Sequence, residues 1–232
     1  MNDNVQTYPG YAGGGTLASQ RQRVLRNTYW LLALSMLPTV LGAWIGVATG
    51  IVAHMGVGMS AIVFLGGAFG FMFAIEKTKE SSTGVAVLLG FTFFMGLMLS
   101  RLLAMMLGTY SNGASLIMTA FGGTSLVFFA MASLATVIKR DLSNMGKFLF
   151  VGVILLLVAG LVNIFLQSSA LMLTLSVAAI AIFSAFMLHD IKRVIDGGET
   201  NYITATLAIY LDLYNVFQSL LMILGVFGGD RE

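Results

Sequence analysis

Charged residues are scarce in this sequence. Only 9% of its 232 residues are charged, whereas 58% are hydrophobic, and the mean hydropathy is +0.92. A water-soluble domain carries about a quarter charged residues, so this composition excludes one and indicates a protein whose solvent is mostly lipid. The net charge of +2 is too small to indicate a nucleic-acid partner.

Residues that form disulfides or bind soft metals are also scarce. The chain has no cysteine and two histidines. This excludes a disulfide framework, an iron–sulfur cluster and a Cys/His zinc site. We therefore expect no resident cofactor.

Long apolar runs are abundant and follow a polar leader. The leader, residues 1–27, is Gly-rich and carries its arginines at its end, unlike a signal peptide, so we expect a flexible cytoplasmic tail. Each later run suffices for a membrane helix, which needs about 20 apolar residues. The sequence predicts an all-α membrane domain, residues 28–232, with seven spans at 28–50, 55–75, 84–107, 115–138, 146–166, 169–188 and 202–227.

Basic residues alternate between the connecting loops. The loops 51–54, 108–114 and 167–168 hold none. By the positive-inside rule, this pattern predicts a cytoplasmic N-terminus and a periplasmic C-terminus. Ten of the twelve basic residues lie in the leader and the alternate loops: Arg21, Arg23, Arg26, Lys77, Lys79, Lys139, Arg140, Lys147, Lys192 and Arg193.

Glycines recur at helical spacing in the first two spans. Gly42, Gly46 and Gly50 lie four residues apart, as do Gly66 and Gly70. Such spacing places small residues on one face of a helix, so we expect close helix packing at both places.

Two charged residues lie at the ends of predicted spans. Arg101 is near the far end of the third span, where we expect it to reach the interface rather than form a buried ion pair. Glu76 lies beside Lys77 and Lys79 where the second span meets the cytoplasm. An interfacial charge is ordinary there, with a gating contact to a cation as the alternative.

Asp212 is the polar residue that most needs an explanation. It lies about 15 Å along a helix from Tyr202, which places it inside the membrane. Asn215 and Ser219 follow it at helical spacing, so one side of this span is small and polar and should face other helices at the centre of the bundle. The lower hydropathy of this run leaves a re-entrant segment as an alternative.

Asp190 is the nearest candidate partner for Asp212, because one short turn joins the last two spans. Two carboxyl groups in a poorly solvated site do not both ionise cheaply, so we expect the pair to share a proton and to sense protons or bind a cation. The alternative is that each aspartate separately accepts hydrogen bonds. An aspartyl protease is not expected, because the residues before Asp212 lack a Gly-x-Gly-Asp motif.

The C-terminal segment HDIKRVIDGGETNYITATLAIYLDLYNVFQSLLMILG resembles the signature region of the transmembrane Bax inhibitor family. Further matches lie in RNTYWLL, GGTSLVFF and VNIFLQ, and the GGETNYI turn is similar to the bacterial YccA-like branch. The resemblance runs from about residue 26 to residue 228.

The resemblance implies a seven-helix inner-membrane protein of bacteria whose last helix is central. It implies two non-enzymatic activities. The leading one is binding and restraint of the membrane-anchored AAA+ protease FtsH. A loose N-terminal tail would give the protease a segment to bind. The other is a pH-sensitive calcium leak regulated by Asp190 and Asp212, with calcium held transiently and at low affinity.

Overall fold

The computed structural model describes residues 13–230, and these form seven helices and no strand. All seven are long and apolar enough to cross a membrane. They are α1 (Gly13–Thr49), α2 (Val57–Thr78), α3 (Ser82–Thr109), α4 (Gly113–Val137), α5 (Met145–Leu166), α6 (Ser169–Asp196) and α7 (Tyr202–Gly228).

The predicted spans are confirmed, although the first and the sixth are longer than expected. The seventh is one continuous helix of 27 residues, so the re-entrant alternative is wrong. Its start is capped by Asn201, whose side chain accepts hydrogen bonds from the backbone N–H groups of Ile203 and Thr204. The sixth continues to Asp196 before Gly197 ends it in a left-handed conformation. Asp190 therefore lies inside α6 rather than at its end.

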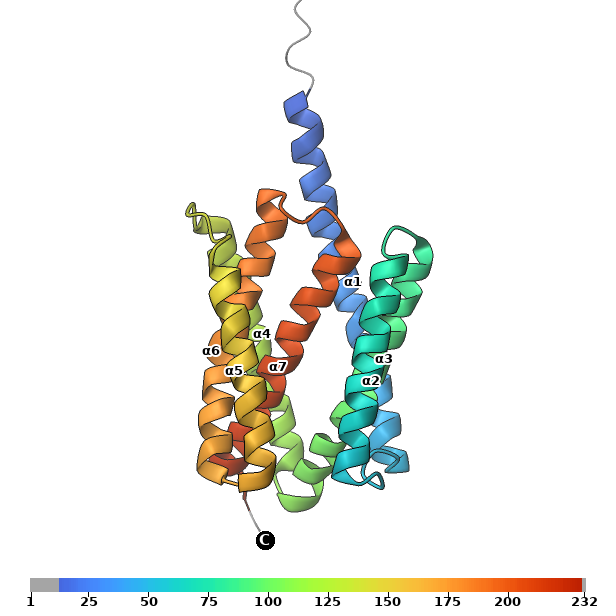
Figure 1. The fold of residues 1–232 in the computed structure, drawn as a ribbon, viewed down its shortest axis with the longest axis vertical. Coiled ribbons are helices and arrows are strands. Elements are labelled where there is room, and N and C mark those ends of the chain that lie inside the picture. Colours follow the sequence, from blue (N-terminus) through green and yellow to red (C-terminus); the bar gives the residue numbers. More distant parts are fainter. Residues whose placement is uncertain (1–12, 231–232) are drawn as a thin grey trace, which may run out of the picture.

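The N-terminal leader differs from the predicted tail. Residues 1–12 lie outside the described part of the chain, but α1 runs without a break from Gly13 through the expected boundary at residue 27. Only the part of this extension nearest the bundle packs on other helices: Val24 is buried against Val194 of α6 and Ala205 of α7, whereas residues 18–23 are exposed. With 37 residues, α1 is about 55 Å long and extends beyond the other helices at one end (Figure 1).

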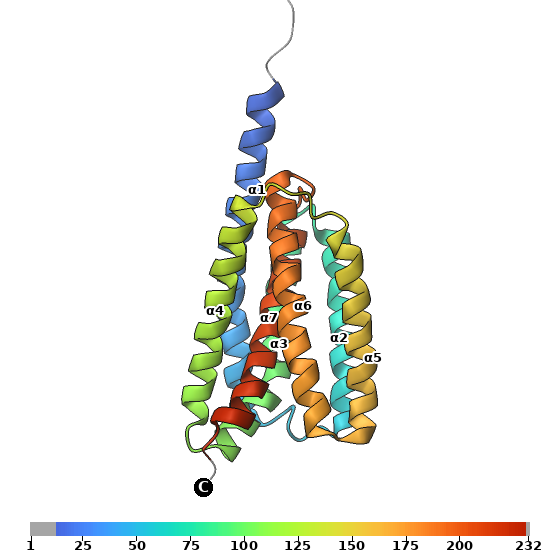
Figure 2. The ribbon, with the colours of Figure 1, turned by 90° about the vertical axis from the view of Figure 1, so that its left-hand side faces the viewer.

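Helix α7 lies at the centre of the bundle, as expected. It contacts α1, α2, α3, α4 and α6, and it crosses obliquely between the α1–α3 group and the α4–α6 group (Figure 1, Figure 2). Helix α5 is the outermost, since it packs on α6 alone among the described helices and has no buried residue. The main buried cluster surrounds α7 and includes Leu32, Leu88, Phe91, Met187, Ile191, Ile209 and Tyr210.

Small residues bring α1 and α3 together. A Cβ atom at Gly42 would lie 2.2 Å from the carbonyl oxygen of Phe93, and one at Gly96 would lie 2.0 Å from that of Thr39. Both are closer than real contacts allow, so only glycine fits. The expectation is confirmed for Gly42, and also for Gly46, where a Cβ would meet the Ser100 hydroxyl at 2.4 Å.

The corresponding expectation for α2 is wrong. A Cβ atom at Gly66 or Gly70 would meet nothing within 4 Å, because this side of α2 faces outward. In lipid, the outer side of a helix is as apolar as its packed side, so glycine spacing does not by itself identify the packed side.

The basic loops gather at one end of the bundle. The N-terminal end of α1 and the α2–α3, α4–α5 and α6–α7 connections lie at this end, while the other three connections and the C-terminus lie at the opposite end (Figure 1). The cytoplasmic location of the basic end stays a prediction of the positive-inside rule.

Candidate functional site

Asp212 is buried at the centre of the bundle. Its residue surface is 4% exposed, and its Oδ2 atom has no hydrogen-bond partner among the described residues. A buried polar atom without a partner is costly and rare in native proteins, and it commonly marks a functional site or a place for a water or an ion. The prediction that Asp212 lies inside the bundle is confirmed.

Asp190 approaches Asp212 from α6. The two carboxyl groups lie within electrostatic range of each other, although no hydrogen bond joins them in the described part of the chain. Asp190 is instead bonded to its neighbour, with 2.8 Å between its Oδ1 atom and Nδ1 of His189. Proton sharing between the two acids stays a prediction.

His189 is the site residue that sequence reasoning missed. Consecutive residues of a helix do not normally face each other, so an adjacent His and Asp gives little sign of a contact. Helix α5 covers this histidine, because Gly146 leaves room for its ring. The result is a cluster of three titratable groups, Asp212, Asp190 and His189, where α6 meets α7.

Four polar residues are predicted as possible supports of the acidic site. Two of them, Asn215 and Ser219, lie on α7, and the other two are Arg101 and Glu76. The Asn215 side chain donates to the carbonyl oxygen of Leu211 in its own helix, at 2.8 Å. Ser219 is 8% exposed. Neither is hydrogen-bonded to an aspartate in the described residues, so a direct contribution to the acidic site stays a prediction.

Arg101 joins α3 to the α1–α2 connection. Its Nη1 atom donates to the carbonyl oxygen of Met55 and to Oγ of Ser60, each at 3.2 Å. The guanidinium is partly buried and lies far along the chain from both partners. Arg101 therefore fixes the connection at the end of the bundle opposite the basic loops.

Glu76 lies on the surface at the end of α2. Its side chain is 63% exposed and forms an ion pair with Lys79 at 2.5 Å. This hydrogen bond raises the pKa of Lys79 above its ordinary value. An exposed pair of this kind fits an ordinary charge at the membrane interface better than a gating contact to a cation.

The acidic cluster is too small for a tight metal site. In residues 13–230, no group of three or more His, Cys, Asp or Glu side chains is arranged to hold a metal ion. Two carboxylates provide fewer ligands than the six to eight oxygens that Ca²⁺ prefers. Low-affinity binding of a cation by Asp190 and Asp212 stays a prediction.

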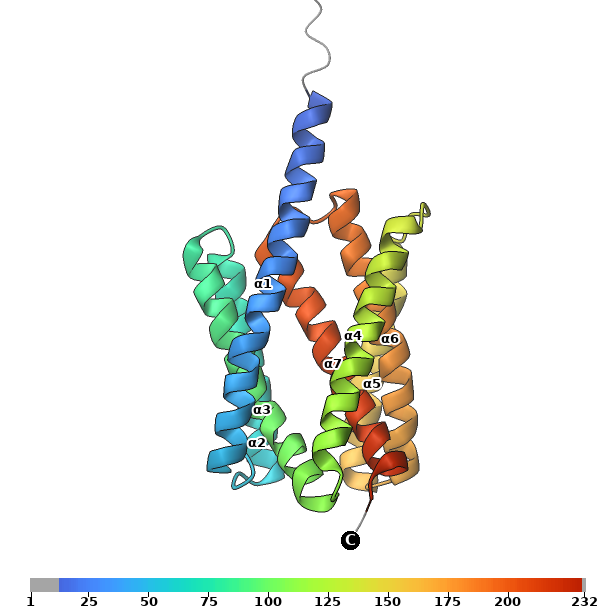
Figure 3. The ribbon, with the colours of Figure 1, turned by 180° about the vertical axis from the view of Figure 1, so that it is seen from behind.

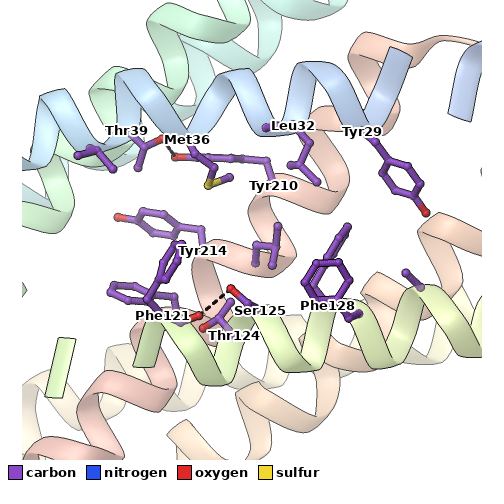
Figure 4. Close-up of a pocket in the computed structure, with 16 residues that line it drawn as sticks. Tyr29, Leu32, Met36, Thr39, Phe121, Thr124, Ser125, Phe128, Tyr210 and Tyr214 are labelled. Atoms are coloured by element: carbon purple, nitrogen blue, oxygen red, sulfur yellow. Dashed lines mark hydrogen bonds between the residues drawn. The ribbon is translucent and has the colours of Figure 1, made fainter. Parts of the chain in front are cut away.

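A second feature, which sequence reasoning missed, is an apolar groove between α1 and α4. These helices do not approach within 8 Å between Cα atoms in the described chain, and α7 forms the floor between them (Figure 3). The groove has a volume of about 520 Å³. Figure 4 shows its lining: Tyr29, Leu32, Ala33, Met36, Thr39 and Val40 of α1, Phe121, Thr124, Ser125, Phe128, Phe129 and Ala132 of α4, and Tyr210, Leu213, Tyr214 and Phe217 of α7.

The groove and the acidic cluster lie on different sides of α7. The residues of α7 that line the groove are spaced three or four apart and form one side of the helix, and Asp212 lies on the other. The central helix therefore separates a polar contact with α6 from an apolar groove that opens sideways.

In residues 13–230, seven helices that are each long and apolar enough to cross a membrane, the last of them central and carrying a buried aspartate, define a multi-pass integral membrane protein. Residues 21–229 match the family model described as "Inhibitor of apoptosis-promoting Bax1". The chain belongs to the Bax inhibitor family, as its resemblance indicated.

Relatives of similar length support this assignment. A protein named "Modulator of FtsH protease YccA" from Escherichia coli is 38% identical over 210 residues, covering 90% of this chain and 92% of its own. A Pseudomonas aeruginosa protein is 37% identical over 227 residues, covering 95% and 97%. A membrane protein of Vibrio cholerae is 37% identical over 218 residues, covering 91% and 92%. With its seven apolar helices, the chain is a multi-pass inner-membrane protein.

Proposed function

We propose that this protein binds an FtsH-type membrane protease and restrains its proteolysis. The observation that carries the proposal is the 38% identity to the E. coli modulator of FtsH, which extends over nine-tenths of both chains. A match over this length includes the spans as well as the connections.

The shape of the N-terminal region is consistent with this proposal. Helix α1 carries the chain beyond the bundle at the basic end (Figure 1), which is the end predicted to face the cytoplasm. A AAA+ protease needs an accessible segment to grip. Residues 1–12 precede this helix, and we propose that they provide that segment.

Association with the protease tests the proposal. The full chain and an affinity-tagged FtsH-type protease are reconstituted together in liposomes and recovered by the tag. Two variants accompany the full chain: one lacks residues 1–12, and one replaces residues 2–12 with a Gly/Ser segment of equal length. We expect the full chain and the Gly/Ser variant to be recovered, because grip depends on accessible length, and the truncated chain to be recovered less. Failure to recover the full chain would contradict the proposal.

We propose a pH-regulated calcium leak as a second candidate function. It is favoured by the buried Oδ2 atom of Asp212, which lacks a partner in the described residues, and by the electrostatic proximity of Asp190. Ionised carboxylates attract Ca²⁺, and protonation removes that attraction. His189 bonds to Asp190, so we propose that it belongs to the same site.

Calcium flux into liposomes between pH 5 and 8 tests the leak. We expect wild-type flux to rise with pH, because the acids lose their protons. Asp212→Asn preserves the shape of the side chain but cannot ionise, so its flux should not depend on pH. Glu76→Gln removes an exposed carboxylate and should behave as wild type. An Asp212→Asn variant that keeps the wild-type pH dependence would exclude this mechanism.

A further inference from the structure

The groove between α1 and α4 is built for an apolar, chain-like ligand. Its rim includes Val40, Phe121 and Phe129, which are 64%, 55% and 64% exposed, so it opens toward the surrounding lipid. Its floor is formed by α7, where Tyr210 and Tyr214 are almost fully buried. An acyl chain could therefore enter from the side without crossing a polar barrier.

Apart from that of Tyr29, the side-chain hydroxyl groups that line the groove are hydrogen-bonded within the protein. The Tyr210 hydroxyl bonds to Oγ1 of Thr39 at 2.9 Å, and the Tyr214 hydroxyl donates to the carbonyl oxygen of Met95 at 3.2 Å. Thr124 and Ser125 donate to carbonyl oxygens in their own helix. With these hydroxyls engaged in this way, the groove offers hydrocarbon contact rather than polar recognition.

A basic pocket adjoins one end of this groove. It has a volume of about 600 Å³ and includes Gln22, Arg23 and Arg26, and it shares Tyr29 with the groove. Both arginines are exposed, and neither forms an ion pair with a described residue. Two cations that form no ion pair with residues 13–230 therefore lie directly beyond the apolar lining.

One side of α1 connects the two pockets. Arg26, Tyr29, Ala33, Met36 and Val40 recur at intervals of three or four residues, so they follow a single stripe along the helix. The stripe changes from basic to apolar at Tyr29. The ring of Tyr29 packs edge-on against that of Phe128 of α4, with 6.0 Å between the ring centroids. A basic surface followed by an apolar one matches an anionic phospholipid, which has phosphate at one end and hydrocarbon at the other.

The size of the groove favours a lipid over a protein helix. A spanning helix about 10 Å wide and 30 Å long displaces roughly 2,400 Å³, which is more than the groove encloses. The basic pocket is formed by α1 alone and lies at the end predicted to be cytoplasmic, where basic residues close to the membrane attract anionic lipid headgroups.

We propose that the groove between α1 and α4 binds one acyl chain of an anionic phospholipid whose phosphate is bound by Arg23 and Arg26. The α7 residues form the floor beneath the chain, and Tyr29 marks the level at which headgroup and hydrocarbon meet. The lipid fills a gap that the helices leave open and thereby joins α1 to α4.

Native mass spectrometry of the full chain tests the headgroup site. Phosphatidylglycerol and phosphatidylcholine with identical acyl chains are the two probes. We expect wild type to bind phosphatidylglycerol at least several-fold more tightly, and Arg23→Gln/Arg26→Gln to lose this preference. The control, Lys139→Gln/Arg140→Gln, removes two exposed charges from the α4–α5 connection and should keep it. Equal binding of both lipids by wild type, or a preference retained without the two arginines, would overturn the proposal.

A groove-filling variant tests the position of the acyl chain. Ala33→Phe places a large side chain in the lining, whereas Ala130→Phe makes the same change at an exposed position of α4 outside it. We expect Ala33→Phe alone to reduce bound phosphatidylglycerol, with both variants melting as folded proteins. Undiminished binding in Ala33→Phe, or recovery of a stoichiometric partner protein in place of lipid, would contradict the assignment.

Discussion

Arg101 shows how a single charged side chain stabilises the end of a membrane helix. Its position near the end of the third span predicts that it reaches toward the interface, and the structure adds two hydrogen-bond partners in the α1–α2 region. These contacts join residues more than 40 positions apart in the chain. Sequence reasoning identifies the exposed end of such a side chain but not the loop that it meets.

Removing this side chain should loosen the α1–α2 connection. Arg101→Leu keeps much of the apolar volume but loses both donated hydrogen bonds. Because the donor is charged and partly buried, we expect a loss of about 1–2 kcal/mol in the free energy of unfolding. Amide hydrogen exchange across residues 50–56 should become faster in Arg101→Leu and change less in Arg101→Lys, which keeps one charged donor. Unchanged exchange in Arg101→Leu would show that these bonds do not hold the connection.

Asp212 and His189 mark the limit of sequence reasoning at single residues. A carboxylate within an apolar run stands out because burying a charge in lipid is costly, so Asp212 is predictable. His189 follows span six near its polar end, where a histidine is unremarkable. Its contact with Asp190 depends on side-chain rotamers and on α5 lying over it, and neither can be read from spacing.

At the scale of helices, packing between α1 and α3 depends on backbone contact at glycine. A Cβ atom at position 96 would lie 2.0 Å from the carbonyl oxygen of Thr39. No side-chain rotation can relieve this clash, because the contacted atom belongs to the backbone. The helices would have to separate.

Alanine substitutions distinguish packed from lipid-facing glycines. We expect Gly96→Ala to destabilise the protein by about 1–3 kcal/mol through overpacking. Gly66→Ala, at an open position of α2, should be neutral or slightly stabilising, since alanine favours a helix by about 0.5–1 kcal/mol over glycine. Thermal unfolding in detergent micelles measures the difference. Equal melting temperatures for the two variants would refute the packing observed between α1 and α3.

The sequence predicts where the helices lie but not which side of each helix packs on its neighbours. All seven spans follow from hydropathy, because lipid requires long apolar segments and internally bonded backbones. The side that each helix presents to its neighbours does not follow, since lipid and protein interior are similarly apolar. Gly42 and Gly66 therefore look alike in sequence, although only Gly42 contacts another helix.

At the scale of the whole molecule, the central position of α7 creates two separate environments. Its polar side meets α6 at Asp190, and its aromatic side forms the floor of the groove between α1 and α4. The groove combines residues from three helices that are distant in sequence, such as Tyr29, Phe128 and Tyr214. No local sequence pattern predicts such a gap, because it exists only where the backbones of α1 and α4 stay apart.

The proposed restraint of an FtsH-type protease by this Bax inhibitor family member can be measured in liposomes. The most direct measurement is the rate at which that protease degrades a membrane substrate in liposomes as the amount of this protein is increased. An unrelated seven-helix protein at equal density controls for crowding. We expect degradation to slow in proportion to the amount of this protein bound to the protease, and to be unaffected by the control protein. Degradation at the same rate at every ratio would contradict the proposal.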